Sequence, residues 1–430
     1  MPDTLIQTRC CITGGGPAGL MLGLLLARAG VEVVVLEKHA DFLRDFRGDT
    51  VHPSTLQVLD ELGLLEAFLR CPHDEARELR GFVGGHETVI ADFSRLRHPY
   101  IVLMPQWDFL DFLRDEAETY ASFRLLTNAQ VQTVTRGEGG RVTGVRGIMR
   151  TPQGQPDGDS FEVRADLVVA ADGRHSQVRA AAGMVVRDMG APIDVLWMRL
   201  PREAGDPNVS GGRIEPGRFL ATINRRYYWQ CAYVIPKGGI EDLRARGLAA
   251  FRAELVSVAP MFAGRVDAAL QSWDDVKLLS VTVDRLEQWC QPGLLAIGDA
   301  AHAMSPVGGV GINLAIQDAV ATANLLAAAL ADPAMDAAEI SALLPSIQKR
   351  RLFPVRVTQA AQLAIQNRLL QPIIQSGASR KDGQASTPMS LPWPLKLMRS
   401  WPWLRSIPAY LVGVGARPEH VHSPQAAPPA

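Results

Sequence analysis

The sequence is poor in cysteine and has almost no net charge. Only five cysteines occur in 430 residues: Cys10, Cys11, Cys71, Cys231 and Cys290. Their number is odd, and no two are spaced as in a metal site or a disulfide framework. We therefore expect buried thiols in a reducing compartment and no bound metal. The formal net charge of −1 leaves no basic footprint for a nucleic acid.

Long uninterrupted hydrophobic runs are also missing. The apolar stretch Gly19–Leu36 is broken by Arg28, Gly30 and Glu32, so a helix followed by a strand explains it better than a membrane span. No basic segment precedes the first apolar run, which argues against a signal peptide. These absences favour a cytoplasmic globular protein, and its length predicts more than one domain.

The N-terminal segment has the pattern of a β-α-β unit. Arg9–Thr13 and Glu32–Leu36 are short apolar runs typical of buried parallel strands. Pro17–Ala29 between them is apolar on nearly every side, as in a buried helix, and Gly30 is placed to end it. The sequence therefore predicts strand, turn, helix and strand at the start of an α/β domain.

Two later strands and a hairpin define the rest of the organisation. The apolar runs Asp166–Ala171 and Gly293–Ile297 each end just before an acidic residue. Between them, Phe219–Asn224 and Tyr227–Ile235 alternate with period two around a polar turn, which predicts an antiparallel hairpin.

We accordingly expect a nucleotide-binding α/β domain that is interrupted by a second domain. The expected parts are residues 1–184 and 281–372 for the α/β domain and its helices, 185–280 for an inserted antiparallel-sheet domain, and 373–430 for a linker and an apolar arm. Ser376–Thr387 is polar enough for a mobile linker, and the last dozen residues are expected to be frayed.

A glycine motif follows the first strand. In Gly14-x-Gly16-x-x-Gly19, the first glycine permits a tight turn, the second lets the backbone approach a pyrophosphate, and the third lets the helix pack against the strand. The helix N-terminus offers free N–H groups to phosphates. Glu37 ends the second strand, at the distance expected of a carboxylate that binds ribose hydroxyls. The combination predicts a bound dinucleotide.

Two further motifs follow the later strands. One is Gly298-Asp299-Ala300-Ala301-His302, followed by the glycine-rich run from Pro306 to Asn313. Its glycines let the backbone approach something flat, and a helix that starts near Ile312 would aim its N–H groups there. The other motif starts at Asp172-Gly173 and ends at Arg179, and taken alone it indicates only a turn.

In this order and spacing, the three motifs resemble the class A flavoprotein monooxygenases, the p-hydroxybenzoate hydroxylase-like family. The resemblance covers roughly residues 9–330. It implies a Rossmann-type FAD-binding domain with an inserted antiparallel-sheet substrate domain and a C-terminal helical region. The residues that it implies for FAD binding are Gly14, Gly16, Pro17, Ala18, Gly19, Glu37, Lys38, Arg47, Gln106, Asp172, Asp299, Gly309, Gly311, Ile312 and Asn313. Pro306 and Asn313, in the loop under the flavin, are the implied catalytic positions.

The family reaction uses NADH or NADPH to reduce the flavin. Reduced flavin adds O2 at C4a, and the resulting hydroperoxide hydroxylates an electron-rich, often aromatic, small molecule. Substrate residues are expected on the inserted sheet, where Tyr227, Trp229 and Tyr233 share one face with Cys231 by alternation. That face is either an aromatic pocket or ordinary sheet core. A monomer or a homodimer is compatible with the sequence.

Three alternatives share the cofactor motifs. Flavin-dependent halogenases carry a Trp-x-Trp-x-Ile-Pro signature between the motifs. The superficial echo here, Trp401 to Pro408, has the wrong spacing and lies near the C-terminus, so a halogenase is rejected. Prenyl reductases of the geranylgeranyl type hydrogenate alkenes without O2, so oxygen uptake separates them from hydroxylases. A non-enzymatic FAD-binding interaction protein would show no flavin reduction by NAD(P)H.

The segment Leu391–Val414 lies beyond these motifs. It mixes tryptophans and leucines with basic residues, and its prolines rule out one long helix. Short amphipathic turns of this composition suit either an arm docked on the protein or a peripheral membrane contact. Of the two, the docked arm is favoured.

Overall fold

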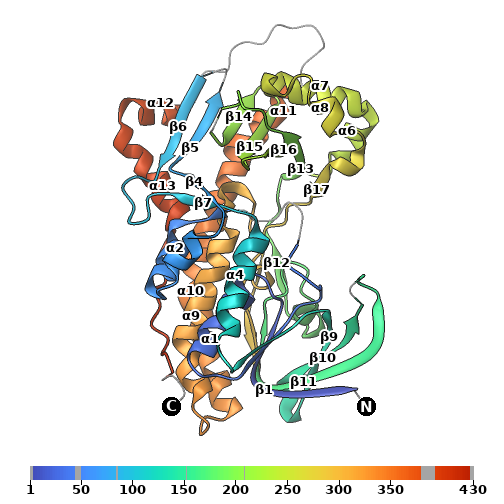
Figure 1. Cartoon of the computed structure of the whole chain (residues 1–430), viewed down its shortest axis with the longest axis vertical. Helices are drawn as coiled ribbons and strands as arrows, with labels where there is room; N and C mark the ends of the chain where they lie inside the picture. Colours follow the sequence, from blue (N-terminus) through green and yellow to red (C-terminus); the bar gives the residue numbers. More distant parts are fainter. Residues whose placement is uncertain are drawn as a thin grey trace.

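The computed structural model describes residues 3–43, 50–83, 86–151, 153–207, 209–378 and 393–426. Its centre is an eight-stranded sheet with a parallel core (Figure 1). The parallel strands are, in spatial order, β20 (Leu294–Ala296), β11 (Pro156–Ala170), β1 (Thr4–Thr13), β2 (Val33–Leu36) and β8 (Phe123–Leu126). A short strand, β19 (Cys290–Gln291), pairs antiparallel at the β20 edge.

The predicted β-α-β unit is present. Helix α1 (Pro17–Arg28) starts with a proline in its first turn and ends at Ala29, after which Gly30 adopts a positive φ of 80°. Strand β1 begins earlier than predicted, because its mixed first half, from Thr4 to Thr8, also pairs with the long strand β11. Tertiary pairing therefore extends a strand that its own apolar pattern does not mark.

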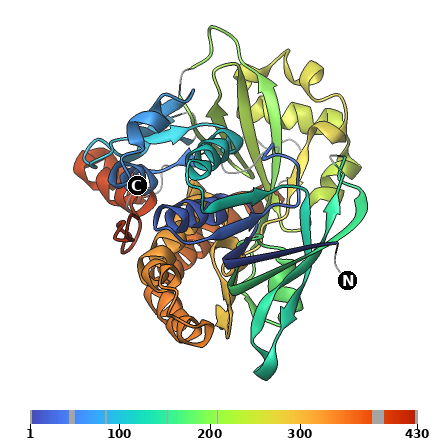
Figure 2. The ribbon, with the colours of Figure 1, turned by 60° about the horizontal axis from the view of Figure 1, so that its bottom comes forward.

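Helices cover one face of the sheet. Helix α1 packs there with α4 (Gln106–Glu118), α9 (Gly311–Ala331) and α10 (Ala337–Ile365) (Figures 1 and 2). Among the described helices, only the stretch Val307–Ala331 is long and apolar enough to cross a membrane, and 72% of its most apolar window is buried. It is therefore the central core helix of the fold.

Antiparallel strands cover the other face. Strands β9 (Ala129–Arg136) and β10 (Val142–Arg150) continue from β11 and fold over a second core. The short helix α5 (Gln177–Ala181) packs against β9. The two-stranded pair β12 (Val186–Asp188) and β18 (Asp284–Leu286) leads toward the second sheet.

The second sheet has seven strands. Their order is β17 (Lys277–Leu279), β13 (Ile193–Pro201), β16 (Tyr228–Pro236), β15 (Arg218–Asn224), β14 (Gly211–Glu215), β5 (Glu78–Val83) and β6 (His86–Asp92). The predicted hairpin consists of β15 and β16, which pair antiparallel. Phe219 lies opposite Val234 at one end of this pairing, and Asn224 lies opposite Trp229 at the other. Strands β5 and β6 come from an earlier part of the chain and join this sheet through a parallel pairing of β5 with β14.

Smaller elements connect the two sheets. A three-stranded sheet consists of β3 (Thr50–Val51), β7 (Ile101–Leu103) and β4 (Asp74–Ala76). The short helices beside the sheets are α2 (Pro53–Glu61), α3 (Leu65–Leu69), α6 (Ile240–Arg246), α7 (Leu248–Val258) and α8 (Val266–Ala269). Helices α6, α7 and α8 follow β16 and cover one face of the second sheet.

The C-terminal region is helical and then extended. After a π-helical turn, Gln366–Leu370, come α11 (Gln371–Ala378), α12 (Trp393–Ser400), a 3-10 turn Pro402–Arg405, and α13 (Ser406–Gly413). Most of the predicted linker, residues 379–387, lies outside the described residues.

The prediction that the last dozen residues are frayed is wrong for 419–426. The side chain of Glu419 is 1% exposed and forms ion pairs with Arg350 and Arg351 of α10. Further along, the N–H of Ala426 donates to the carbonyl of Arg28. Buried charge pairing therefore fixes a tail whose composition alone indicates fraying.

Candidate active site

Four of the predicted site residues follow the carboxyl ends of neighbouring parallel strands. Gly14 follows β1, Glu37 follows β2, Asp172 comes two residues after β11, and Asp299 follows β20. Open α/β sheets bind their ligands at this edge. Motifs that are far apart in the sequence therefore meet at one edge of the central sheet.

The glycine motif touches the Asp-Gly motif directly. Gly14 has a φ of +104°, and a Cβ there would lie 2.4 Å from the carbonyl oxygen of Ala171 and 2.7 Å from the Cα of Asp172. Both values are far below any real Cβ contact, so this position requires glycine for conformation and for space. The crossing of the two motifs depends on that missing side chain.

The third motif joins them through two close contacts. A Cβ at Gly298 would lie 3.1 Å from Ala18 of α1 and 3.3 Å from Ala315 of α9. Arg179, the last residue of the Asp-Gly motif, donates from Nη1 to the carbonyl of Ala300 at 3.2 Å. All three motifs therefore form one connected structure.

The N-terminus of α1 is built to receive an anion. Gly16 occupies the N-cap and gives the helix no side-chain cap, and a Cβ at that position would meet no atom within 4 Å. The N–H groups of the first turn, at Ala18 and Gly19, are aligned with the positive end of the helix dipole. Open space next to these groups fits the pyrophosphate of a dinucleotide.

Glu37 holds the glycine loop from the other side. Its Oε2 accepts from the N–H of Gly15 at 3.0 Å, and its Oε1 accepts from the N–H of His39 at 3.1 Å. These two bonds fix the carboxylate at the end of β2, where ribose hydroxyls would be bound. The neighbouring Lys38 is exposed at the same strand end.

Asp172 is oriented by the start of α5. Its Oδ2 accepts from the N–H of Gln177 at 2.8 Å and from that of Val178 at 3.3 Å. Its Oδ1 is buried and has no hydrogen-bond partner among the described residues. Burial raises the pKa of this carboxyl above its ordinary value. A buried acceptor without a partner fits a site completed by a ligand that donates a hydrogen bond.

The glycine-rich loop before α9 offers a second place for a ligand to approach. Gly308 and Gly309 have φ values of 80° and 65°, and Thr50 donates to the carbonyl of Gly309 at 3.2 Å. Helix α9 begins at Gly311 without a side-chain cap. Its first N–H groups, which include that of Ile312, therefore make this end of the helix positive. Pro306, which is half-buried, stands just before the two glycines.

The side chain of Asn313 has a positioning role. Its Oδ1 accepts from the N–H of His52 at 3.2 Å and from the hydroxyl of Thr55 at 2.8 Å, which ties α2 to the first turn of α9. Two donors therefore occupy this oxygen, whereas Nδ2 is buried without a hydrogen-bond partner among the described residues. Its backbone N–H remains among those at the start of α9.

A row of buried glutamines, which the sequence analysis missed, supports the same loop. Gln362 donates from Nε2 to the carbonyls of Ser305 and Val307, both at 2.9 Å, and accepts from the N–H of Ser305 at 3.1 Å. Gln359 donates to the carbonyl of Ala303, and Gln366 to the hydroxyl of Ser305. Their spacing on one helical face was the signal available in the sequence.

An ionic network reaches from the Gly298 turn to the C-terminal tail. Asp318 of α9 accepts from the N–H of Gly298 at 3.0 Å, contacts Nε2 of His302 at 2.5 Å, and accepts from Nε of Arg351 at 2.9 Å. Although burial opposes it, the charges of His302 and Arg351 lower the pKa of Asp318. His302 therefore serves this buried network.

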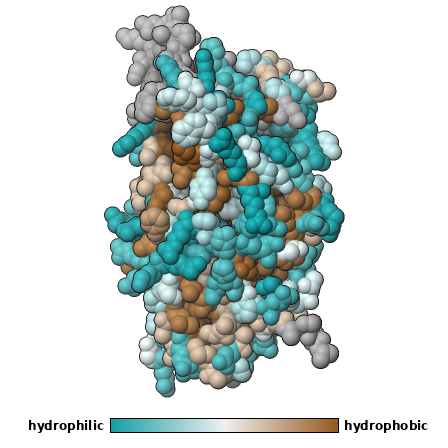
Figure 3. Space-filling model, turned by 90° about the vertical axis from the view of Figure 1, so that its left-hand side faces the viewer, coloured by the Kyte–Doolittle hydropathy of each residue, from teal (hydrophilic) through white to brown (hydrophobic). Residues whose placement is uncertain are grey.

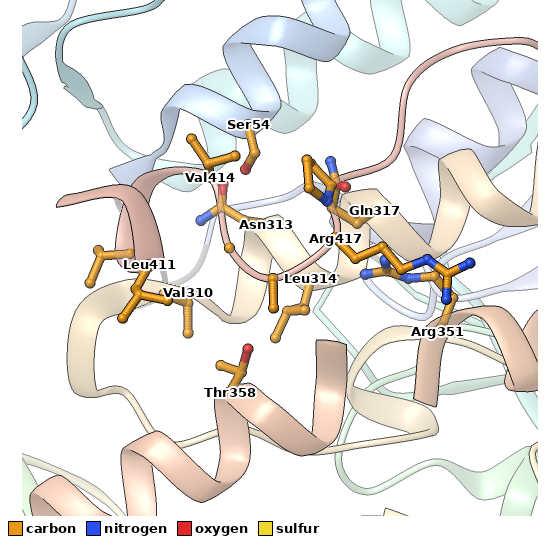
Figure 4. Close-up of a pocket in the computed structure, with 14 residues that line it drawn as sticks. Ser54, Val310, Asn313, Leu314, Gln317, Arg351, Thr358, Leu411, Val414 and Arg417 are labelled. Carbon is orange, nitrogen blue, oxygen red and sulfur yellow. The ribbon is translucent and has the colours of Figure 1, made fainter. Parts of the chain in front are cut away.

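A small cavity of about 30 Å³ lies beside this network (Figure 4). Residues from α9, α10 and the segment after α13 line it, among them Asn313, Gln317, Arg351 and Arg417. Each of the first three has a buried side-chain nitrogen without a hydrogen-bond partner among the described residues. The cavity is large enough for one or two water molecules, and ordered water is the usual partner of such groups.

The expected aromatic face of β16 is not brought to this site. Trp229 and Tyr233 are buried against the helices that follow β16, where their rings pack edge-on against Phe262 and Phe251. Tyr227 precedes the strand and is 85% exposed. The alternation therefore marked ordinary sheet core. Tyr227, Trp229 and Tyr233 do not line a cavity together.

Two predicted residues, Gln106 and Arg47, remain. Gln106 is half-buried in the first turn of α4, beside Pro105 at the N-cap. Arg47 lies outside the described residues. Within the described part of the chain, no group of three or more metal-ligating side chains comes together.

Comparisons with known proteins agree with this geometry. The family model described as "FAD binding domain" matches residues 7–361. The 6-methylpretetramide 4-monooxygenase of Streptomyces rimosus is 37% identical over 323 residues, which cover 74% of this chain and 75% of that protein. The rifampicin monooxygenase of Streptomyces venezuelae is 27% identical over 72% of this chain, which spans only 61% of that relative's length.

A solved structure shows the same fold. PqsL of Pseudomonas aeruginosa, solved in complex with 2-aminobenzoylacetate, superposes with a TM-score of 0.69 at 23% identity, over 87% of this chain and all of that one. The family match extends over the three motifs and the inserted sheet alike. The chain therefore belongs to the FAD-binding-domain family of class A flavoprotein monooxygenases and is an FAD-dependent oxidoreductase.

Proposed function

We propose that the protein uses NADH or NADPH and O2 to hydroxylate an aromatic or other electron-rich apolar small molecule. The observation that carries this proposal is the meeting of Gly14, Glu37, Asp172 and Asp299 at one sheet edge, in a chain 37% identical to a named monooxygenase. Bound FAD would supply the electron transfer from NAD(P)H and the activation of O2.

The N-termini of two helices, α1 and α9, would bind different parts of the cofactor. The first turn of α1 would bind the pyrophosphate, and Glu37 would accept from the ribose hydroxyls of the adenosine half. Asp172 and Asp299 would accept from hydroxyls farther along the cofactor. The start of α9 would stabilise negative charge on the flavin ring, since its N–H groups carry the positive end of a 21-residue helix.

The substrate would border the flavin-side face of the seven-stranded sheet. Trp197, Ala232 and Val234 lie on the face opposite Trp229, in one hydrophobic cluster with Val307. Val307 belongs to the loop of residues 303–310, which is proposed to lie under the flavin and is called the flavin loop. Because the loop residue contacts this face, we infer that these side chains, rather than Tyr227, Trp229 and Tyr233, help to exclude water from the reacting position.

A screen for compounds that accelerate NAD(P)H oxidation by the purified holoprotein tests the proposal. A true substrate should increase oxygen consumption and yield a product heavier by one oxygen atom, and that atom should carry the label when labelled O2 is supplied. Reduction of an alkene without O2 uptake would instead identify a prenyl-type reductase. Failure of both nicotinamides to reduce the flavin would favour a non-enzymatic FAD-binding protein.

The proposal also covers the cellular compartment, the oligomeric state and the partners of the protein. We propose that it acts in the cytoplasm as a monomer or homodimer, with a small molecule and O2 as its partners and no nucleic acid. The five free cysteines, three of them buried, agree with a reducing compartment. Sedimentation of the purified holoprotein would determine its oligomeric state.

A further inference from the structure

The C-terminal arm, residues 396–417, is docked on the protein by its inner side. Ala409 of α13 is fully buried in a hydrophobic cluster with Ala91 and Phe93, next to strand β6. A Cβ at Gly413 would lie 3.1 Å from both Leu96 and Pro53, which shows how closely the helix approaches. The arm is therefore held in place, and its outer side is a fixed surface.

That outer side is rich in exposed large apolar side chains. The exposed fractions are 54% for Trp401, 54% for Trp403, 51% for Ile407, 47% for Tyr410 and 53% for Leu411. An open groove of about 380 Å³ runs between this arm and the turn at Arg95 and Leu96. Figure 3 faces the side of the molecule that carries α12 and α13, where apolar patches alternate with hydrophilic surface.

The charged residues of the arm itself have one sign. Residues 393–418 contain Lys396, Arg399, Arg405 and Arg417 but no aspartate or glutamate. The next acidic residue, Glu419, is 1% exposed and is held in ion pairs. Across the groove, Arg95 adds another exposed cation. An occupant of this surface must therefore be apolar and negatively charged.

We propose that the arm binds the surface of an anionic lipid bilayer. Tryptophan and tyrosine rings prefer the boundary between headgroups and acyl chains, and basic side chains beside them attract anionic headgroups. A second copy of the chain fits less well, because a two-fold contact would bring the same cations of both copies together without a carboxylate from either arm. The proposal does not depend on which reaction the enzyme catalyses.

Sedimentation of the holoprotein with vesicles tests this inference. The protein should pellet with vesicles that contain phosphatidylglycerol and should stay in solution with pure phosphatidylcholine, and salt should weaken the binding. The double variant Trp401→Ser/Trp403→Ser should bind at least about tenfold more weakly, since two rings that would enter the bilayer are lost. The charge reversal Lys396→Glu/Arg399→Glu should weaken binding by a similar factor.

A matched control separates this surface from general stickiness. Phe353 on α10 is 57% exposed, so Phe353→Ser removes a comparable ring elsewhere and should leave vesicle binding unchanged. Bound FAD, measured by its absorbance, checks that every variant is folded. The proposal is overturned if the protein stays in solution with anionic vesicles or if the double variant binds like the control. It also fails if light scattering shows a dimer that the tryptophan substitutions dissociate.

Discussion

At the scale of single residues, glycines with a positive φ differ in what they require. Gly14 combines a positive φ with backbone atoms where its Cβ would lie, whereas Gly63, with a φ of +72°, has no atom within 4 Å of that point. Conformational strain alone costs an alanine about 1–2 kcal/mol in this backbone region. A backbone clash adds to this cost, because neither segment can yield without moving a strand end.

Gly14→Ala should therefore destabilise the protein by at least about 3 kcal/mol, and Gly63→Ala by only about 1 kcal/mol. Thermal unfolding of the two variants, measured without added FAD, distinguishes the two contributions. Equal shifts in Tm would show that the crowding by Ala171 has no energetic effect.

The carboxylate of Glu37 holds the glycine loop and is proposed to bind the ribose of the cofactor as well. Glu37→Ala removes the acceptor of the Gly15 and His39 N–H groups as well as the expected ribose contact. A charge-assisted hydrogen bond contributes about 1.5–3 kcal/mol, so FAD affinity should fall about tenfold or more. Titration of the apoprotein by quenching of flavin fluorescence measures this change.

Glu32 provides the matched control, because it is exposed at the opposite end of the same strand. Glu32→Ala should leave the affinity for FAD unchanged. If both variants bind FAD equally well, Glu37 is not a ribose ligand.

His52 gives stability a pH dependence. It is fully buried, its Nδ1 lies 2.8 Å from the carbonyl of Val412, and burial lowers its pKa to about 4. The unfolded chain, with an ordinary histidine pKa of about 6.5, binds the proton more readily. The contribution of His52 is therefore fully present above about pH 6.5 and is lost as the pH falls toward 4, by on the order of 3 kcal/mol.

His52→Asn keeps a donor near the Nδ1 position and removes the titrating ring. The free energy of unfolding of this variant should change less between pH 6.5 and 4.5 than that of the natural protein. Denaturant titrations at both pH values measure the difference. An unchanged difference would mean that other groups cause the acid sensitivity.

At the scale of elements, α10 acts as a support for the flavin loop. The glutamine row hydrogen-bonds the backbone of residues 303–307, which itself has no regular secondary structure in its first half. A polar row inside a long helix carries a cost unless every group is satisfied. Here the bonds to the loop satisfy most of the hydrogen-bonding groups of the glutamine side chains, so the helix and the loop stabilise each other.

Gln362→Met, which keeps the side-chain volume, should destabilise the protein by about 2–4 kcal/mol, because three backbone hydrogen bonds are lost. It should also weaken FAD binding, since Val307 belongs to the flavin loop. Lys349→Met, an exposed change on the same helix, is the control for both thermal unfolding and FAD titration. A variant with normal affinity for FAD would confine Gln362 to stability.

Between elements, the C-terminal tail acts as a strap. Glu419 lies against Arg350 and Arg351 of α10, and its N–H donates to Gln317 of α9. Asp318 of α9 then continues the chain of contacts to the Gly298 turn. The tail is thereby connected to the Gly298 turn through buried charges, which are costly to leave unpaired.

At the scale of the whole molecule, FAD should hold the segments of the chain together. A ligand that binds only the folded state stabilises it by about 2.7 kcal/mol at a concentration one hundred times its dissociation constant. Addition of FAD to the apoprotein should therefore raise Tm by several degrees. Asp299→Ala should abolish that rise, whereas the exposed change Asp159→Ala should leave it intact. A rise that persists in Asp299→Ala would remove Asp299 from the cofactor site.

Local sequence patterns were sufficient for the parts of the fold whose requirements are local. The first β-α-β unit, the hairpin of β15 and β16, and the strands before Asp172 and Asp299 all depend on short periodicities and on glycine or acidic residues at strand ends. The order and spacing of these motifs indicated the family that the comparisons show. No pattern of this kind marked β5 and β6 as members of the second sheet, because that pairing joins distant parts of the chain.

The sequence by itself thus determined a flavoprotein fold and the motifs that meet at one edge of its central sheet, since glycine conformation and hydrophobic period are properties of neighbouring residues. Only the tertiary structure decided how each two-faced element was used. Alternation placed Trp229 and Ala232 on opposite faces of β16. The helices that follow β16 cover the tryptophan face, and the other face packs against Val307 of the flavin loop. In the same way, Asn313 and Glu419 received their roles from partners on other elements, because hydrogen bonds and ion pairs of buried groups are fixed by packing.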